Sequence, residues 1–297
     1  MRGGRRRQKR LAQRHARVDG IAFTMPVECR NSPVLMAGFT IDAGKARELI
    51  PCSEVHPLEL WNGRGVLLVT VIDYRETTIG KYIEYSIAIA CTHGARPAPP
   101  LLPGLLMKLF GTGQWVVELP VSSEISVKGG KGIWGMPKHR APLDFKIRDR
   151  SVSAQYDLDG RLATYVEIDR PSRTGFPLRM AAANYCAFRG LMMKSYIYFS
   201  GRAGFALGPK ARGRLVVGDH PRVAPLKTLD IAESPLLTAF IPSAHGILDD
   251  YFECWFMTFP EPPAHDMEGM ESVVDLRLSE EWPPAPAASV PGAPLVS

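Results

Sequence analysis

Residues 66–74 (VLLVTVIDY) and 82–91 (YIEYSIAIAC) decide the fold class of this 297-residue chain. Both runs are rich in β-branched and aromatic residues, a composition that is typical of strands. In the second run small or polar side chains alternate with large apolar ones. Because successive side chains of a strand point to opposite faces, this alternation predicts a strand with one face on a hydrophobic core.

The same period of two recurs along the chain. Asp159 and Gly160 stand between two alternating runs, which is a strong signal for a β-hairpin. Further strands are predicted at residues 115–127, 141–147, 151–168, 214–217, 236–241, 252–259 and 272–278. Helices are predicted at residues 43–49, 101–110 and 177–190. Strands outnumber helices and do not alternate regularly with them, so we predict a mainly β, antiparallel, barrel-like fold with peripheral helices rather than a doubly wound α/β sheet.

The charge of the chain is concentrated at its N-terminus. The formal net charge is +6, but residues 1–20 hold eight basic side chains and one acidic one. The rest has 28 basic and 29 acidic residues, so the body is nearly neutral and does not resemble a nucleic-acid binder. We therefore expect residues 1–24 to be a basic, disordered and dispensable arm, residues 25–281 to be one β-barrel domain, and residues 282–297 to be a disordered tail rich in proline and alanine.

Several readings of the basic arm stay open at this point. Translation starting at Met25, contact with nucleic acid or a membrane surface, and a transit peptide are alternatives to a disordered leader, although the segment lacks serine. No apolar stretch follows the arginines, which argues against a secretory signal, and no apolar run is long enough to span a membrane.

The cysteines and histidines give no sign of a metal site. The five cysteines are scattered without a C-x-x-C pair, and the seven histidines show no ligand spacing. We therefore expect neither a disulfide framework nor a metal, and a reducing, cytoplasmic environment.

Residues 132–139 (GIWGMPKH) carry the clearest chemical signal. Lys138 follows Pro137, whose ring restricts the backbone, in a stretch that is otherwise apolar. Burial beside Trp134 and Met136 would disfavour the ammonium form and lower the pKa of the amine. A neutral lysine amine attacks a ketone to form a Schiff base, so Lys138 is the candidate nucleophile.

Glu84 is the second candidate, because it lies on the small and polar face of its predicted strand. That face consists of Tyr82, Glu84, Ser86, Ala88 and Ala90. It could border solvent, in which case Glu84 is an ordinary surface residue, or it could line a cavity that admits a ligand.

These motifs together resemble the acetoacetate decarboxylase superfamily over most of residues 35–260. The resemblance depends on Tyr82-Ile83-Glu84, on Ser123-Glu124 with Gly129 and Gly130 before Gly135-Met136-Pro137-Lys138, and on Gly218-Asp219-His220-Pro221 before Pro235-Leu236-Leu237. It implies antiparallel sheets around a cone-shaped barrel with the active site in its lumen. It also implies that Lys138 is the Schiff-base lysine and Glu84 an active-site carboxylate.

The chain also departs from the pattern of the family. The second lysine that usually follows the catalytic one is His139 here, and an arginine expected in the N-terminal strand falls near Ser32, with Arg30 two residues away. A further lumen glutamate is replaced by Val69 or a neighbour. These differences put decarboxylation of acetoacetate itself in doubt but leave the amine chemistry in place.

The sequence therefore predicts a carbon–carbon lyase that acts on a small keto acid or ketone through Lys138 and Glu84, without a cofactor. A decarboxylase is the favoured reading, and the alternatives are an aldolase-dehydratase using the same lysine or a non-catalytic barrel that binds an apolar carbonyl compound. We expect a homo-oligomer with neither nucleic-acid nor membrane partners. The candidate substrate-binding residues are Tyr82, Trp134, Met136 and Arg140, of which Trp134 and Met136 are expected mainly to pack around the lysine and Arg140 could instead form an exterior salt bridge.

Overall fold

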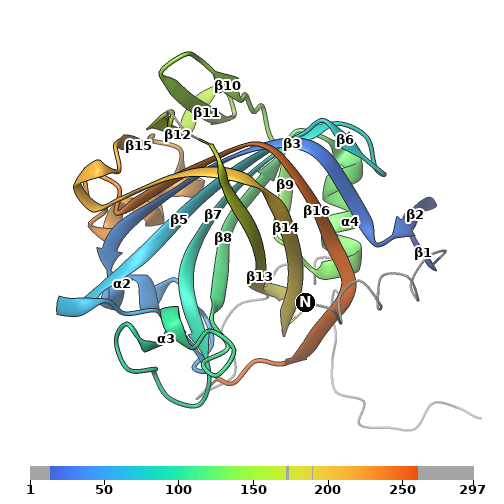
Figure 1. Cartoon of the computed structure of the whole chain (residues 1–297). Coiled ribbons are helices and arrows are strands. Elements are labelled where there is room, and N and C mark those ends of the chain that lie inside the picture. The colour runs from blue at the N-terminus through green and yellow to red at the C-terminus, as the bar shows by residue number, and fades with distance from the viewer. Residues whose placement is uncertain (1–13, 172–173, 189, 260–297) are drawn as a thin grey trace, which may run out of the picture.

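A computed structural model describes residues 14–259, except residues 172–173 and 189. Within this part, seven strands pair in a closed circle to form a barrel (Figure 1). In spatial order they are β3 (Val27–Asp42), β5 (Arg64–Tyr74), β7 (Tyr82–His93), β8 (Gly113–Val121), β13 (Phe176–Phe188), β14 (Leu191–Leu207) and β16 (Leu237–Phe256). All neighbours around the circle are antiparallel except β8 and β13, which are parallel. The predicted mainly β, barrel-like fold is confirmed.

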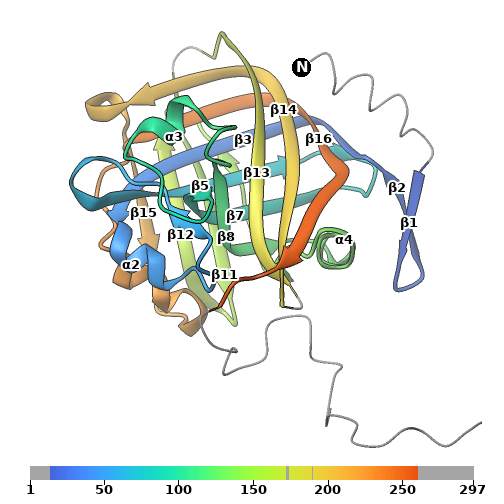
Figure 2. The same ribbon diagram turned by 90° about the horizontal axis from the view of Figure 1, so that it is seen from below.

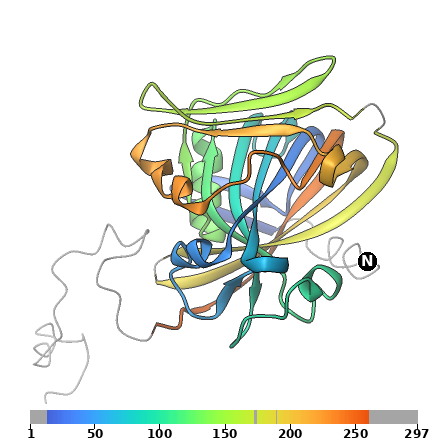
Figure 3. The same cartoon turned by 90° about the vertical axis from the view of Figure 1, so that its left-hand side faces the viewer.

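Short strands extend the barrel wall, and a second sheet lies outside it. The strands β4 (Val55–Pro57), β6 (Glu76–Thr77) and β9 (Lys138–Arg140) pair with β7, β3 and β8. The second sheet has the order β10-β11-β12-β15, and Figure 3 shows its β11–β12 hairpin running across the outside of the barrel. Its strands are β10 (Lys146–Ile147), β11 (Ser151–Leu158), β12 (Arg161–Asp169) and β15 (Gly213–Val217).

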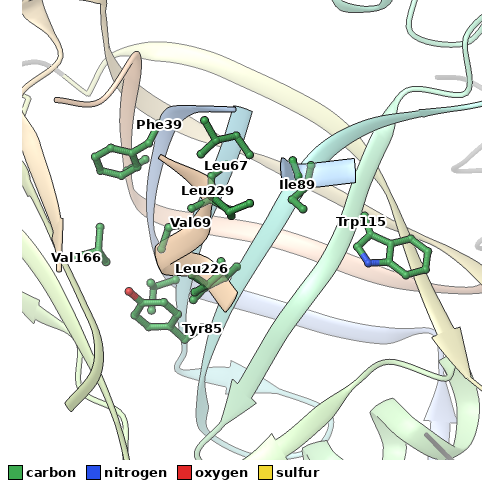
Figure 4. Close-up of a cluster of buried hydrophobic side chains, with 14 of the residues drawn as sticks. Phe39, Leu67, Val69, Tyr85, Ile89, Trp115, Val166, Leu226 and Leu229 are labelled. Carbon is green, nitrogen blue, oxygen red and sulfur yellow. The ribbon is translucent and has the colours of Figure 1, made fainter. Parts of the chain in front are cut away.

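The main hydrophobic core lies between the outer face of the barrel wall and this second sheet. Figure 4 shows Phe39, Leu67 and Tyr85 from the barrel wall, facing Val166 of β12 and Leu226. Leu226 belongs to the 3₁₀ segment η3 (Pro221–Leu229). The outer face of β5 and β7 is thus filled by apolar packing, as the alternating pattern predicts, and their other face is left for the lumen.

Three helices lie around the barrel in the described residues: α2 (Ala43–Glu48), α3 (Leu102–Leu105) and α4 (Glu124–Trp134). Further 3₁₀ turns are η1 (Trp61–Gly63) and η2 (Gly208–Lys210). No helix of this part of the chain is long and apolar enough to span a membrane.

The N-terminal boundary differs from the expectation. Residues 14–25 are not a disordered arm but a hairpin of β1 (Arg14–Val18) and β2 (Ile21–Met25), which packs beside α4 (Figure 2). Phe23 is only 1% exposed and belongs to an apolar cluster with Trp134. The domain therefore extends N-terminal of residue 25. Residues 1–13 and the tail at 282–297 lie outside the described residues.

Several predicted elements differ in type or length. The strand predicted at 115–127 ends at Val121, and its last part is the start of α4. The helix predicted at 177–190 is strand β13, which is held by β14 along its whole length. The helix predicted at 101–110 is a single turn, α3, since it contains Pro103 and Gly104.

Among the other predicted strands, some are confirmed, one is mostly absent and one lies outside the described residues. In the range predicted as a strand at 141–147, which includes Pro142, only Lys146–Ile147 form a strand, and Leu143 makes an isolated bridge to Tyr156. The strands predicted at 236–241 and 252–259 are the two ends of β16, and the one at 272–278 lies outside the described residues. The hairpin at Asp159-Gly160 and the strand at 214–217 are confirmed.

Candidate active site

The barrel lumen contains a cavity of about 320 Å³. It is lined by the inner faces of the barrel strands, by Met136 and Lys138, and by Gly104 and Met107 in and just after α3. Tyr82, Glu84, Ser86 and Ala90 of β7 all line it, so the small and polar face of this strand points into a cavity rather than to solvent.

The end of α4 directs Lys138 into this cavity. Gly135 ends the helix in the left-handed conformation (φ 64°), where glycine is favoured, and its N–H reaches back to the carbonyl oxygens of Gly130 and Lys131. The chain then enters β9, which pairs with β8 so that Lys138 lies opposite Leu119. Lys138 therefore occupies a short strand rather than a loop, with its side chain toward the lumen.

Buried polar groups surround the Lys138 amine. The lysine is 2% exposed, and its Nζ lies 2.6 Å from Oε2 of Glu84. The Nζ also donates a hydrogen bond to Oγ of Ser126 at 3.1 Å and lies 5.5 Å from the ring centroid of Tyr82. The two residues that the sequence singles out are thus in direct contact.

Gly130 makes room for the aliphatic part of this lysine. A Cβ atom at position 130 would lie 2.3 Å from Cδ of Lys138, closer than any unstrained contact. Gly129 has the same relation to Phe23, with its Cβ position 2.7 Å from the ring. The glycines of α4 therefore let the helix approach both the lysine and the N-terminal hairpin.

Two stacked tyrosines, Tyr74 and Tyr82, line the cavity near Glu84. The rings of Tyr74 and Tyr82 have centroids 4.5 Å apart and lie on paired positions of β5 and β7. Burial, together with the nearby Glu84 carboxylate, raises the pKa of both hydroxyls well above the usual value. Both tyrosines are therefore neutral at physiological pH and can donate hydrogen bonds.

The altered family positions contribute no further charge to the lumen. Ser32 is fully buried and donates to the carbonyl oxygen of Arg30, whose own side chain is 71% exposed and lies near Glu28. Val69 points into the outer core, and its neighbour Thr70 lines the cavity. Among the described lining residues, Lys138 and Glu84 are thus the only ones with a formal charge.

The remaining candidates separate into two groups. Tyr82 and Met136 line the cavity. Trp134 is 2% exposed but belongs to the apolar cluster below α4 and does not line the cavity. Arg140 is exposed at the end of β9 and does not line the cavity, although alternation would place it on the same side of the strand as Lys138.

His139 points away from the lumen into a buried polar cluster. Its Nε2 lies 2.9 Å from the hydroxyl of Tyr156 and 3.6 Å from Oε2 of Glu118. Glu118 in turn accepts a hydrogen bond from Nε of Arg222 at 2.9 Å. Burial, aided by Arg222, lowers the pKa of His139 to about 4, so the imidazole is neutral at pH 7. His139 therefore offers Lys138 no positive charge.

Sequence reasoning missed Ser126 and Tyr74. Ser126 fell in a predicted strand, and only the helical assignment of α4 brings its hydroxyl to the lysine. Tyr74 could have been found, since the register that pairs the two predicted strands places it opposite Tyr82. In the described part of the chain, no three His, Cys, Asp or Glu side chains gather in a way that could hold a metal ion.

Comparison with known proteins identifies the family of the chain. A family model described as acetoacetate decarboxylase (ADC) matches residues 12–171, more than half of the chain. The chain belongs to the acetoacetate decarboxylase family. The match includes both Glu84 and Lys138, and a search of curated proteins finds no significant match.

Solved structures share the fold of this family member at low sequence identity. Acetoacetate decarboxylase from Legionella pneumophila aligns with a TM-score of 0.57 and 15% identity, over 78% of this chain and 88% of that one. A second acetoacetate decarboxylase structure gives 0.54 and 15%, over 78% and 90%. The enduracididine biosynthesis enzyme MppR gives 0.51 and 12%, over 78% and 88%. At these identities the likeness establishes the fold alone.

Proposed function

We propose that this protein is a carbon–carbon lyase that forms a Schiff base between Lys138 and the carbonyl group of a keto substrate. The observation that carries the proposal is the buried Lys138 amine, 2.6 Å from the Glu84 carboxylate at the wall of a cavity. Burial alone would suit a structural ion pair, but the adjoining cavity leaves space for a carbonyl compound beside the amine.

The first step makes the amine nucleophilic. Glu84 accepts a proton from the Lys138 ammonium, which frees the nitrogen lone pair to attack the carbonyl carbon. The two protons that the nitrogen loses are transferred to the carbonyl oxygen, which leaves as water and gives an iminium ion. Glu84 is the carboxylate within reach to carry these protons, and the neutral hydroxyls of Tyr82 and Ser126 can donate hydrogen bonds to the oxygen.

The iminium ion then accepts the electron pair of the bond between the α and β carbons of the substrate, counted from the iminium carbon. If that bond leads to a carboxylate, carbon dioxide leaves; if it leads to a carbinol, the hydroxyl proton passes to a base and a carbonyl fragment leaves. Both routes give an enamine on Lys138, which is reprotonated at carbon and hydrolysed to release the product. Glu84 is the proposed proton donor and acceptor in these steps.

The charges in the lumen favour the aldol type of cleavage. Among the described lining residues a substrate carboxylate would find no cation except Lys138 itself, and it would lie close to the Glu84 carboxylate. Decarboxylation, which the sequence favours, is the second candidate, because the apolar lining would strip water from a carboxylate and so promote loss of carbon dioxide.

Borohydride trapping tests the proposed function. The protein is mixed with a panel of ketones and keto acids, reduced with sodium borohydride, and examined by intact mass spectrometry. One reduced adduct per chain is expected, and release of carbon dioxide or of an aldehyde fragment from the corresponding substrates separates the two reactions. Ligand binding without any adduct would contradict the proposal and leave a barrel that binds apolar carbonyl compounds.

A further inference from the structure

The cavity continues far beyond the reactive pair. Glu84 and Ala90 both line it and are six residues apart on β7, so the lining runs about 20 Å along this strand. The register of the wall places Gln114 of β8 beside Ala90, and Asn184 of β13 beside Gln114. The far end of the cavity is thus formed by residues distant from Lys138.

The far part of the cavity is apolar and uncharged. Its described lining includes Met36, Leu58, Leu68, Met107, Val116 and Met180. The amides of Gln114 and Asn184 are the main polar groups there, and they bond to each other at 2.6 Å. A ligand group in this region would therefore meet methionine and aliphatic side chains and no charged partner.

The lining of the cavity at this far end includes an exposed residue. Gly104 of α3 and Met107, two residues after this helix, line the cavity, and Met107 is 47% exposed. Leu102 and Leu106 of the same segment are 40% and 47% exposed. Exposed, large apolar side chains thus lie next to the far end of the cavity, where polar side chains would be expected for a small charged keto acid.

The size of the cavity also exceeds the need of such a substrate. About 320 Å³ lies at the lower end of the range of roughly 300–1,000 Å³ that is typical of pockets for drug-sized ligands. A small keto acid bound at Lys138 would leave the apolar cavity wall around Ala90 without contact.

We propose that the substrate is a ketone with a long, uncharged, apolar arm. The carbonyl carbon lies at Lys138, and the arm extends along β7 past Ser86 and Ala90 toward α3. This inference rests on the proposed Schiff-base function of Lys138, and it specifies which carbonyl compounds that lysine receives.

A series of methyl ketones tests this inference. Binding of 2-butanone, 2-hexanone and 2-nonanone is measured by isothermal titration calorimetry, and each complex is then reduced with borohydride. Burial of each added methylene should strengthen binding about two- to fourfold, so 2-nonanone should bind at least roughly 30-fold more tightly than 2-butanone. Equal affinities across the series would overturn the inference while an adduct on Lys138 would still support the Schiff-base function.

Filling the far end should remove the preference for the long ketone. Ala90→Phe, or Ala182→Phe if the first variant folds poorly, should reduce the ratio of the two affinities to within about threefold, because the ring occupies the space of the arm. Ala224→Phe adds the same ring at an exposed site in η3 and should keep the wild-type ratio. A preference that survives both lumen variants would show that the arm binds elsewhere, whereas tight binding without any reduced adduct would contradict the Schiff-base function.

Discussion

Two buried carboxylates lie on opposite faces of the barrel wall, and each is paired with a cation. Glu84 faces the lumen and contacts Lys138 at 2.6 Å. Glu118 faces the outer core and contacts Nε of Arg222 at 2.8 Å. The exposed fractions of the two carboxylate side chains are similarly low, at 13% and 6%.

The partners and surroundings make the two pairs different. A lysine amine can lose its proton and become a nucleophile, whereas an arginine guanidinium stays charged in proteins. The lumen pair borders a cavity, and the outer pair is packed against Tyr156 and His139. Burial of a charge pair is therefore not a sufficient sign of catalysis; a deprotonatable amine and space for a substrate are also needed.

The largest expected difference between the pairs concerns turnover. Glu84→Gln should lower kcat by roughly 10²- to 10⁴-fold, because an amide cannot carry protons, while an adduct on Lys138 can still form. Glu118→Gln should instead reduce the free energy of unfolding by about 1–3 kcal/mol, because it weakens a buried hydrogen-bonded pair, and leave kcat per folded molecule within a few-fold. Steady-state kinetics and urea denaturation of both variants measure the two effects. Loss of turnover in Glu118→Gln with only a loss of stability in Glu84→Gln would contradict the catalytic role of Glu84.

A smaller loss of turnover is expected when Lys138 is displaced by a substitution at Gly130 than when its partner Glu84 is replaced. Gly130→Ala puts a methyl group 2.3 Å from Cδ of Lys138, so the lysine side chain must shift, and a shift of about 1 Å in a reacting group can cost about 10²-fold in rate. Gly129→Ala is the matched control, since its methyl group meets Phe23 instead. Equal kcat values for the two variants, corrected for the folded fraction, would contradict this role of Gly130.

Part of this comparison could be read from the sequence. The alternation in residues 82–91 separates Glu84 from the core-facing Tyr85, and β5 and β7 occur where they are predicted. Lys138 and His139 lie on opposite sides of β9, although no strand is predicted at these residues from the sequence. Local period is informative for β5 and β7 because each of these strands has one face on the core.

The rest depended on tertiary contacts that no local pattern encodes. The helix α4 contains Gly129, Gly130 and Gly132, which are poor helix formers, and it is held by close packing on Phe23, Lys138 and Val18. Ser126 was missed for this reason. The strand β13 is rich in alanine, which favours a helix locally, but its pairing with β14 overrides that preference.

The N-terminal hairpin supports α4 and should therefore affect stability more than chemistry. A variant that lacks residues 1–24 loses Phe23, and removing a buried phenylalanine side chain typically costs about 3–5 kcal/mol. Its melting temperature should fall clearly below that of a variant that lacks only residues 1–12, as measured by circular dichroism. Identical melting curves would restore the view that the whole segment is dispensable.

The outer cluster should also make the stability of the protein depend on pH. The pKa of His139 is about 4 in the folded protein, below the reference of about 6.5 for an unfolded chain. Between these values the unfolded state binds more protons, so this group lowers stability as the pH falls from about 6.5 toward 4 and adds no further change below that. His139→Gln should show a shallower loss over this range in urea denaturation, and parallel curves would contradict the assignment.

The position of a reduced adduct tests the central claim most directly. The protein is treated with 2-butanone and borohydride, digested, and mapped by tandem mass spectrometry, with Lys138→Arg as the control that keeps the charge but cannot form an imine. We predict a modified peptide at Lys138 in the wild type and no modified peptide in the variant. An adduct at another lysine, or one that persists in Lys138→Arg, would contradict the account.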